Sequence, residues 1–177
     1  HEEDVRRDGT SRTNTKELKV VEKLYNWRKK IFQKENNMMI SFYKAQYRDL
    51  EDLKLKKDDR NLTVDACQGS EEDAVILSCV RGNKFHGIGF CKHPNRLNVA
   101  LSRARGKLYI VGNFSTFNSR RNKQWGTLCK MMTPVKRGEK NIDKLLKEFK
   151  QEKVYTLLAA NLTILCISIC ILLNKTI

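Results

Sequence analysis

Apolar residues recur every three or four positions between Leu18 and Ile31, a spacing that places them on one face of an α-helix. Asn14 precedes this stretch, and Glu17 follows three residues later, which resembles the capping box found at the start of many helices. The asparagines at positions 36 and 37 interrupt the pattern. We therefore expect a helix that begins after Asn14 and ends before residue 36.

Four short apolar runs predict strands that are buried on both faces, because their apolar residues are continuous and do not alternate with polar ones. These runs cover residues 38–42, 62–66, 74–80 and 108–112. Further helical stretches are expected at 45–55, 95–104, 125–132 and 141–150, and loops at 1–13 and 81–94. Strands that alternate with helices predict an α/β fold, in which a parallel sheet is covered by helices on both faces.

The stretch from residue 154 to residue 173 has no charged side chain over its 20 residues, which is long enough to span a bilayer as a helix. Lysines flank it at both ends. One interpretation is an apolar C-terminal helix that anchors the protein in a membrane. The other is a sequence that runs past the natural end of the domain. The chain is thus divided into a domain (1–135), a basic helical extension (136–153) and an apolar segment (154–177).

Charge points to an anionic partner. The chain of 177 residues has 35 Lys and Arg against 20 Asp and Glu, a formal net charge of +15. Nucleic acid is the first candidate for such a partner and anionic lipid the second, while a basic surface that serves only solubility is the alternative. The six cysteines lack the paired spacing of a zinc module, so we expect no metal site and free thiols in a reducing compartment, the cytoplasm or the nucleus.

Polar residues that could bind a ligand or take part in catalysis gather in three blocks, at 41–46, 63–78 and 96–105. The first two are expected at the carboxyl ends of strands, where functional residues of parallel sheets gather. Gln68 and Gly69 would let the main chain approach a ligand closely. Arg103 and Arg105 flank a helix and could present a planar charge to a phosphate. Taken singly, a Gln-Gly pair is usually a turn and helix arginines are usually solvated.

In this order and spacing the blocks resemble the motifs of superfamily-one helicases. Residues 65–80 resemble motif V, residues 96–105 resemble motif VI, and residues 43–46 are similar to the region of motif IV. Ser11 to Asn14, with Glu17, match the segment that opens the same domain. Residues 87–90, 95–100 and 110–113 are especially similar to the up-frameshift RNA helicases of nonsense-mediated decay and to senataxin-type relatives. The resemblance covers about residues 5–133.

This resemblance implies the second RecA-like domain of a translocating helicase, in which ATP binds between two such domains. Arg103 would be the arginine finger and Arg105 a supporting arginine. Residues implied on the nucleotide side are Gln68, Gly69, Glu71, Tyr43 and Gln46, and those implied on the nucleic-acid side are Thr63, Arg48 and Asn98. Asp65 is expected to be structural. The chain departs from the family where Tyr47 precedes Arg48, where Ser102 replaces the commoner Thr, and where Ser70 stands at a position that often holds Arg.

A phosphate-binding loop of the form Gly-x₄-Gly-Lys-[Ser/Thr] is absent from the sequence. ATP and Mg²⁺ are therefore expected only together with a first RecA-like domain, and the chain alone is expected to be inactive as an ATPase. Expected partners are that first domain and single-stranded RNA or DNA. Two alternatives stay open: a non-catalytic module that binds nucleic acid, and a tail-anchored membrane protein.

Overall fold

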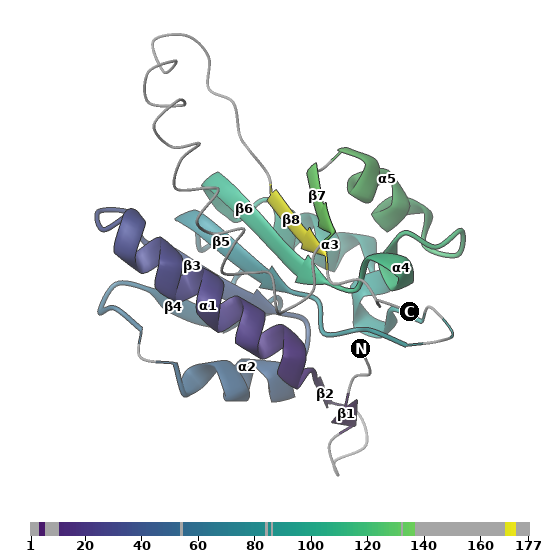
Figure 1. Cartoon of the computed structure of the whole chain (residues 1–177), viewed down its shortest axis with the longest axis horizontal. Helices are drawn as coiled ribbons and strands as arrows, with labels where there is room; N and C mark the ends of the chain where they lie inside the picture. The colour runs from purple at the N-terminus through teal and green to yellow at the C-terminus, as the bar shows by residue number, and fades with distance from the viewer. Residues whose placement is uncertain are drawn as a thin grey trace, which may run out of the picture.

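The computed structural model describes residues 4–5, 11–53, 55–83, 85, 87–131, 133–136 and 169–172 (Figure 1). Its strands are β1 (Asp4–Val5), β2 (Arg12–Thr13), β3 (Asn37–Ser41), β4 (Arg60–Thr63), β5 (Glu72–Ser78), β6 (Ala104–Gly112), β7 (Thr133–Lys136) and β8 (Ile169–Leu172). Its helices are α1 (Thr15–Ile31), α2 (Lys44–Glu51), the 3₁₀ helix η1 (Gly89–Lys92), α3 (Pro94–Leu101), α4 (Phe114–Phe117) and α5 (Lys123–Met131). The helix expected at 141–150 lies outside the described residues.

The six strands from β3 to β8 form one sheet in the order β4-β3-β5-β6-β8-β7, and all neighbouring strands in it are parallel. Strands β1 and β2 form a small antiparallel pair of their own, inside a segment expected to be a loop. The parallel α/β sheet expected from the sequence is thus confirmed. Strand β6 begins at Ala104, four residues before the expected Leu108, because residues 104–107, in which small residues alternate with Arg105 and Lys107, contain no apolar run.

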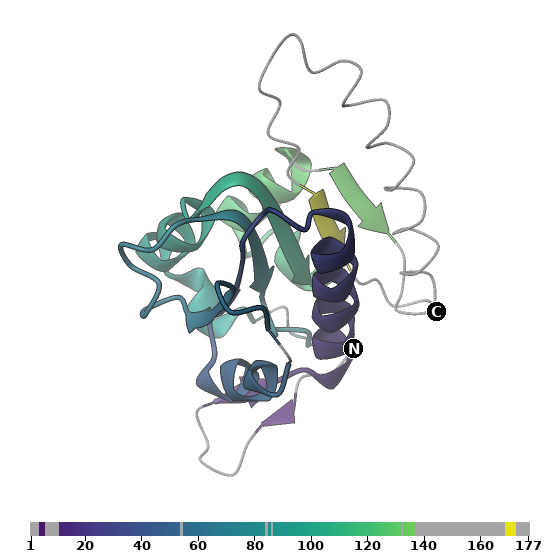
Figure 2. The ribbon, with the colours of Figure 1, turned by 90° about the vertical axis from the view of Figure 1, so that its left-hand side faces the viewer.

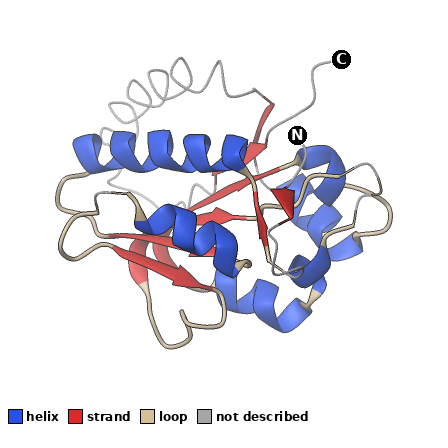
Figure 3. Ribbon diagram, turned by 90° about the horizontal axis from the view of Figure 1, so that it is seen from below, coloured by secondary structure: helices blue, strands red, loops and turns tan. Residues whose placement is uncertain are grey.

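Helices cover both faces of the sheet, so neighbouring residues of a strand are buried on opposite sides. Met39 and Ile76 pack with α1 and α2, whereas Met38 and Val75 pack in the other core, together with residues of α3 and α5. Figure 2 shows α1 and the green helices on different sides of the strands, and Figure 3 shows helices on both sides of the sheet. Two-sided burial explains why the central strands read as continuous apolar runs.

Helix α1 begins where the sequence predicts. Its N-cap is Asn14, whose Oδ1 accepts a hydrogen bond from the backbone N–H of Glu17 at 3.1 Å. At its other end Arg28 is fully buried. The guanidinium donates to Asn37 Oδ1, to the Tyr109 hydroxyl and to Glu35 Oε2, each at 2.7 Å, so it ties α1 to β3 and β6.

The apolar C-terminal segment corrects one expectation. Residues 169–172 form strand β8 between β6 and β7, where the sequence predicts part of a helix. An apolar run suits a central strand as well as a membrane helix, since both are enclosed on all sides. No helix in the described part of the chain is long and apolar enough to cross a membrane. Residues 154–168 and 173 lie outside that part.

Candidate nucleotide and nucleic-acid faces

The candidate residues separate into two groups at opposite edges of the parallel sheet. Thr63 ends β4 and Tyr43 follows β3, so both lie at the edge formed by the carboxyl ends of the strands. Glu71 and Arg103 directly precede β5 and β6, so both lie at the edge formed by the amino ends. The expectation of a carboxyl-end position is therefore wrong for residues 68–71. The segment from residue 64 to residue 71 leads from the end of β4 to the start of β5, and we call it the crossing segment.

The crossing segment is joined to α3 and the start of β6 at two points. Near the carboxyl edge, Arg96 donates two hydrogen bonds to the carboxylate of Asp65, at 2.8 and 2.9 Å. Near the amino edge, Arg103 Nη1 donates to the carbonyl oxygen of Ser70 at 3.3 Å. Between these points Cys67 is buried in the same core as Leu97. The motif V and motif VI blocks are thus brought side by side.

At the amino edge, the guanidinium of Arg103 is held by oxygen atoms of its own domain. Besides Ser70, it donates to the Val99 carbonyl oxygen at 3.1 Å and to Ser102 Oγ at 2.8 Å. Ser102, which replaces the commoner Thr, therefore still supplies a hydroxyl that accepts a hydrogen bond from Arg103. These contacts fix a partly buried planar charge, which is the property that a phosphate-binding arginine needs.

Arg105 lies at the same edge and is more exposed. Its Nη2 lies 3.3 Å from Asp73 Oδ1 and 3.7 Å from Glu72 Oε2. The Glu72 carboxylate is buried and also lies 3.3 Å from Arg60 Nε. Sequence reasoning missed the role of Glu72 and Asp73, although two acids immediately after the motif V glutamate were a visible signal. Acidic partners orient Arg105 but also neutralise it.

Gln68, Gly69 and Glu71 are exposed at this edge. Gly69 has φ +81°, and a Cβ placed there would meet no atom within 4 Å. The glycine is thus required by the backbone conformation, and its backbone is open to a ligand. Asn98, which the resemblance assigns to the nucleic-acid side, is exposed midway along α3.

At the carboxyl edge, Gln46 is fully buried. Its Oε1 accepts hydrogen bonds from Thr13 Oγ1 at 2.9 Å and from the Asn14 backbone N–H at 2.8 Å, and its Nε2 donates to Ser78 Oγ at 3.0 Å. The side chain therefore joins α2 to the start of α1 and the end of β5. Its contact with nucleotide stays a prediction.

Tyr43 is also buried, and it supports the loop that follows β5. Its hydroxyl accepts hydrogen bonds from Arg81 Nη1 and from the Phe90 backbone N–H, both at 3.2 Å. Burial raises the pKa of Tyr43, so the hydroxyl stays protonated. At Gly89, where φ is +48°, a Cβ would overlap both the Tyr43 hydroxyl and the Arg81 guanidinium. The nucleotide contact implied for Tyr43 is likewise untested.

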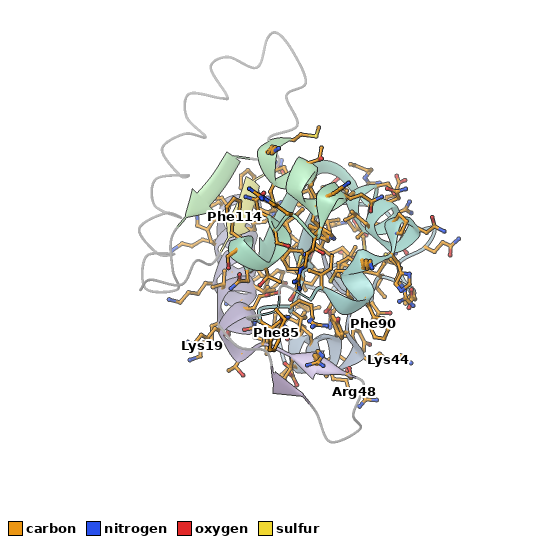
Figure 4. All side chains as sticks on the ribbon, turned by 90° about the vertical axis from the view of Figure 1, so that its right-hand side faces the viewer. Lys19, Lys44, Arg48, Phe85, Phe90 and Phe114 are labelled. Carbon is orange, nitrogen blue, oxygen red and sulfur yellow. The ribbon has the colours of Figure 1, made fainter. Side chains whose placement is uncertain are left out.

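Basic and aromatic side chains are exposed beside this edge. Figure 4 shows Lys44 and Arg48 of α2 on the same side of the molecule as Phe85 and Phe90. Both phenylalanines are strongly exposed for their size, at 79% and 41%. Thr63 is half-buried, and its Oγ1 accepts a hydrogen bond from the Ala66 backbone N–H. Sequence reasoning missed the phenylalanines, although an aromatic residue in a glycine-containing surface loop is a recognisable signal.

Comparison with known proteins gives a consistent family. A family described as "AAA domain" matches residues 1–115. The chain is 38% identical over 121 residues to "Regulator of nonsense transcripts 1" of Dictyostelium discoideum, covering 63% of this chain and 9% of that protein. It is 38% identical over 132 residues to "Probable helicase senataxin" of Homo sapiens, covering 70% of this chain and 5% of that protein. A Drosophila melanogaster homologue of regulator of nonsense transcripts 1 is 38% identical over 122 residues, covering 63% of this chain and 10% of that protein.

The chain thus spans a tenth or less of the length of these relatives. The match extends from the N-terminal residues through β6 and includes the crossing segment, Arg103 and Arg105. The parallel sheet with helices on both faces agrees with the RecA-like fold that the helicase motifs imply. The chain belongs to the AAA domain family, and it is a helicase domain of the kind found in regulator of nonsense transcripts 1 and senataxin.

Proposed function

We propose that the chain is the second RecA-like domain of an ATP-dependent helicase, and that its amino edge completes an ATP site whose other half is a first RecA-like domain. The observation that carries this proposal is the placement of Arg103, which is held on the carbonyl oxygens of Val99 and Ser70 beside the open backbone of Gly69. A guanidinium held in one orientation next to accessible backbone N–H groups is suited to binding the oxygen atoms of a phosphate group.

Each residue at this edge has a distinct role in the proposal. Arg103 would contact the γ-phosphate, where an arginine stabilises the charge that develops during phosphoryl transfer. Arg105 would assist Arg103 by leaving its ion pair with Asp73 and contacting the nucleotide instead. Gln68 and Glu71 would flank the phosphates. The phosphate-binding loop and the Mg²⁺ ligands would belong to the first domain, because the sequence has no Gly-x₄-Gly-Lys-[Ser/Thr] loop.

The carboxyl edge would then carry single-stranded nucleic acid. Thr63 ends β4 at this edge, Arg48 lies on the same side of the molecule as the exposed Phe85 and Phe90, and the net charge of +15 favours a polyanion. RNA is the favoured ligand, because regulators of nonsense transcripts are named for transcripts. The compartment would be reducing, cytoplasmic or nuclear, which suits the free buried thiols of the described cysteines.

A chimera tests the nucleotide part of the proposal. Residues 1–115 would replace the matching segment of the Dictyostelium discoideum relative, and RNA-stimulated ATP hydrolysis would be measured. Arg103→Ala is expected to lower the rate by roughly 10³–10⁵. Arg103→Lys would restore little of it, because an ammonium group lacks the planar fork. Lys57→Ala, which removes an exposed cation just before β4, is the matched control and should leave the rate unchanged.

Two results would contradict the proposal. One is a chimera whose rate falls equally in Arg103→Ala and Lys57→Ala. The other is RNA-stimulated ATP hydrolysis by the isolated 177-residue chain that disappears in Arg103→Ala, since the chain alone is expected to be inactive.

A further inference from the structure

Arg96 is held in one orientation by contacts on two sides. Its Nε and Nη2 donate to the two carboxylate oxygens of Asp65, which fixes the plane of the guanidinium. The Phe90 ring lies beneath it, with 5.1 Å between the guanidinium carbon and the ring centroid. Phe90 in turn lies against the Tyr43 ring, at a centroid distance of 5.3 Å. These four side chains, Asp65, Arg96, Phe90 and Tyr43, form what we call the Arg96 stack.

The Arg96 stack borders a surface pocket at the start of α3. The pocket has a volume of about 360 Å³ and is lined by His93, Pro94, Asn95 and Arg96. This volume falls within the range of pockets that bind small organic ligands. The Arg96 side chain is about one-third exposed (34%) and is one of the residues that line the pocket.

Stability alone does not account for this arrangement. The Asp65 side chain is 66% exposed, and ion pairs at such positions contribute little to folding, because water screens them. The effect of the pair is instead to hold the guanidinium plane in one orientation and to offset part of its charge. Proteins stack unpaired bases on aromatic rings and on Arg guanidinium planes, and here the guanidinium of Arg96 lies on the ring of Phe90.

We propose that the Arg96 stack and its pocket bind one unpaired nucleobase of a single-stranded nucleic acid, with the base stacked on the Arg96 guanidinium and its edge toward Asn95. This proposal rests on the nucleic-acid part of the proposed function and adds a base-binding site to it. Lys44 and Arg48, which lie on the same side of the molecule as Phe90, would contact phosphates of the same strand. Because stacking tolerates every base, the site would grip the strand without strong sequence preference.

The first experiment separates base contacts from phosphate contacts. The full chain would be titrated with a single-stranded oligoribonucleotide and with an abasic oligomer of the same length and charge. Arg96→Lys keeps the charge and removes the plane, so it is expected to weaken binding of the base-bearing oligomer roughly fivefold or more and to leave the abasic oligomer within about twofold. Arg120→Lys, an exposed arginine elsewhere, is the control and should change neither.

A second variant should change the affinity for RNA in opposite directions, depending on whether the surface binds only phosphates or also stacks a base. Asp65→Asn releases Arg96 but raises the net charge by one. A surface that binds only phosphate should then bind RNA as tightly as before or more tightly. A base platform should bind the base-bearing oligomer more weakly, and a 2-aminopurine placed in the oligomer should lose the fluorescence quenching that stacking causes. Asp58→Asn makes the same charge change at an exposed position before β4 and is the matched control.

The outcomes separate the two levels of the proposal. Equal losses for both oligomers in Arg96→Lys, or tighter binding by Asp65→Asn, would overturn the base platform and leave the proposed function standing. Failure of the unmodified chain to bind either oligomer would overturn both the platform and the nucleic-acid part of the proposed function.

Discussion

The carboxylate of Glu17, in the first turn of α1, accepts a hydrogen bond from the backbone N–H of Val80 at 2.8 Å. Ser78 Oγ donates to the same carboxylate oxygen at 2.7 Å, and Asn14 Nδ2 donates to the Val80 carbonyl oxygen at 2.9 Å. Val80 has φ +67°, a conformation that a β-branched residue rarely adopts. The start of α1 therefore holds the chain in a strained turn just after β5, where the loop toward Phe90 begins.

Glu17→Gln should destabilise the domain. Glu17 is 1% exposed, and a neutral amide would accept weaker hydrogen bonds from Ser78 and Val80 than a carboxylate does. We expect the free energy of unfolding to fall by about 1–3 kcal/mol, measured by urea denaturation. Glu22→Gln, at an exposed position on the same helix, is the control. Equal stability of the two variants would show that the buried contacts contribute nothing.

Substitutions at Val80 should reverse the usual order of alanine and glycine. Alanine at a positive φ costs about 1–2 kcal/mol, whereas glycine adopts this conformation freely. We expect Val80→Gly to unfold at a higher urea concentration than Val80→Ala. Val75 is fully buried in the regular strand β5, and there we expect Val75→Ala to be more stable than Val75→Gly by about 0.5–1 kcal/mol. The same order at both positions would argue against strain at Val80.

Gly89→Ala should disturb the loop that presents Phe90. The added Cβ would overlap the Tyr43 hydroxyl, and the positive φ adds a backbone cost of about 1–2 kcal/mol. Gly87→Ala is a close control, because a Cβ there meets Arg81 and Asn83 only at 3.6 and 3.8 Å. We expect Gly89→Ala to lower both the unfolding free energy and the affinity for a base-bearing oligomer, and Gly87→Ala to change neither. Unaltered binding by Gly89→Ala would separate this glycine from the site.

Stability should fall in acid partly through Glu35. Burial raises the pKa of this carboxyl group, but hydrogen bonds from Lys107 and Arg28 outweigh burial and hold its pKa below the usual 4.5. A lowered pKa in the folded state contributes stability that is present above pH 4.5 and is lost as the pH falls through the folded value. Glu35→Gln should therefore reduce the difference between unfolding free energies at neutral and acidic pH. Glu22→Gln, the same substitution at an exposed position of α1, is the control.

Elements with a strong local pattern were predictable from the sequence. The period of α1 and its Asn14 cap depend on neighbouring residues, and the central strands are continuous apolar runs because helices cover both faces of the sheet. The short pair β1–β2 and the start of β6 were not predictable, because neither contains an apolar run: β1 and β2 have two residues each, and β6 begins Ala-Arg-Gly-Lys. β8 was missed because an apolar run suits a buried strand and a membrane helix equally.

The sequence by itself determined the α/β class, the helicase motifs and their order, because these depend on local periodicity and on residue types at short spacing. Only the tertiary structure decided which edge of the sheet each motif residue occupies, since that depends on how the crossing segment returns from β4 to β5. The tertiary structure also buries Gln46, whose side chain connects α2 to the start of α1 and the end of β5. It brings Asp65 into contact with Arg96, 31 residues away in the chain. Hydrogen bonds between distant segments form only after the chain has folded, and no local pattern encodes them.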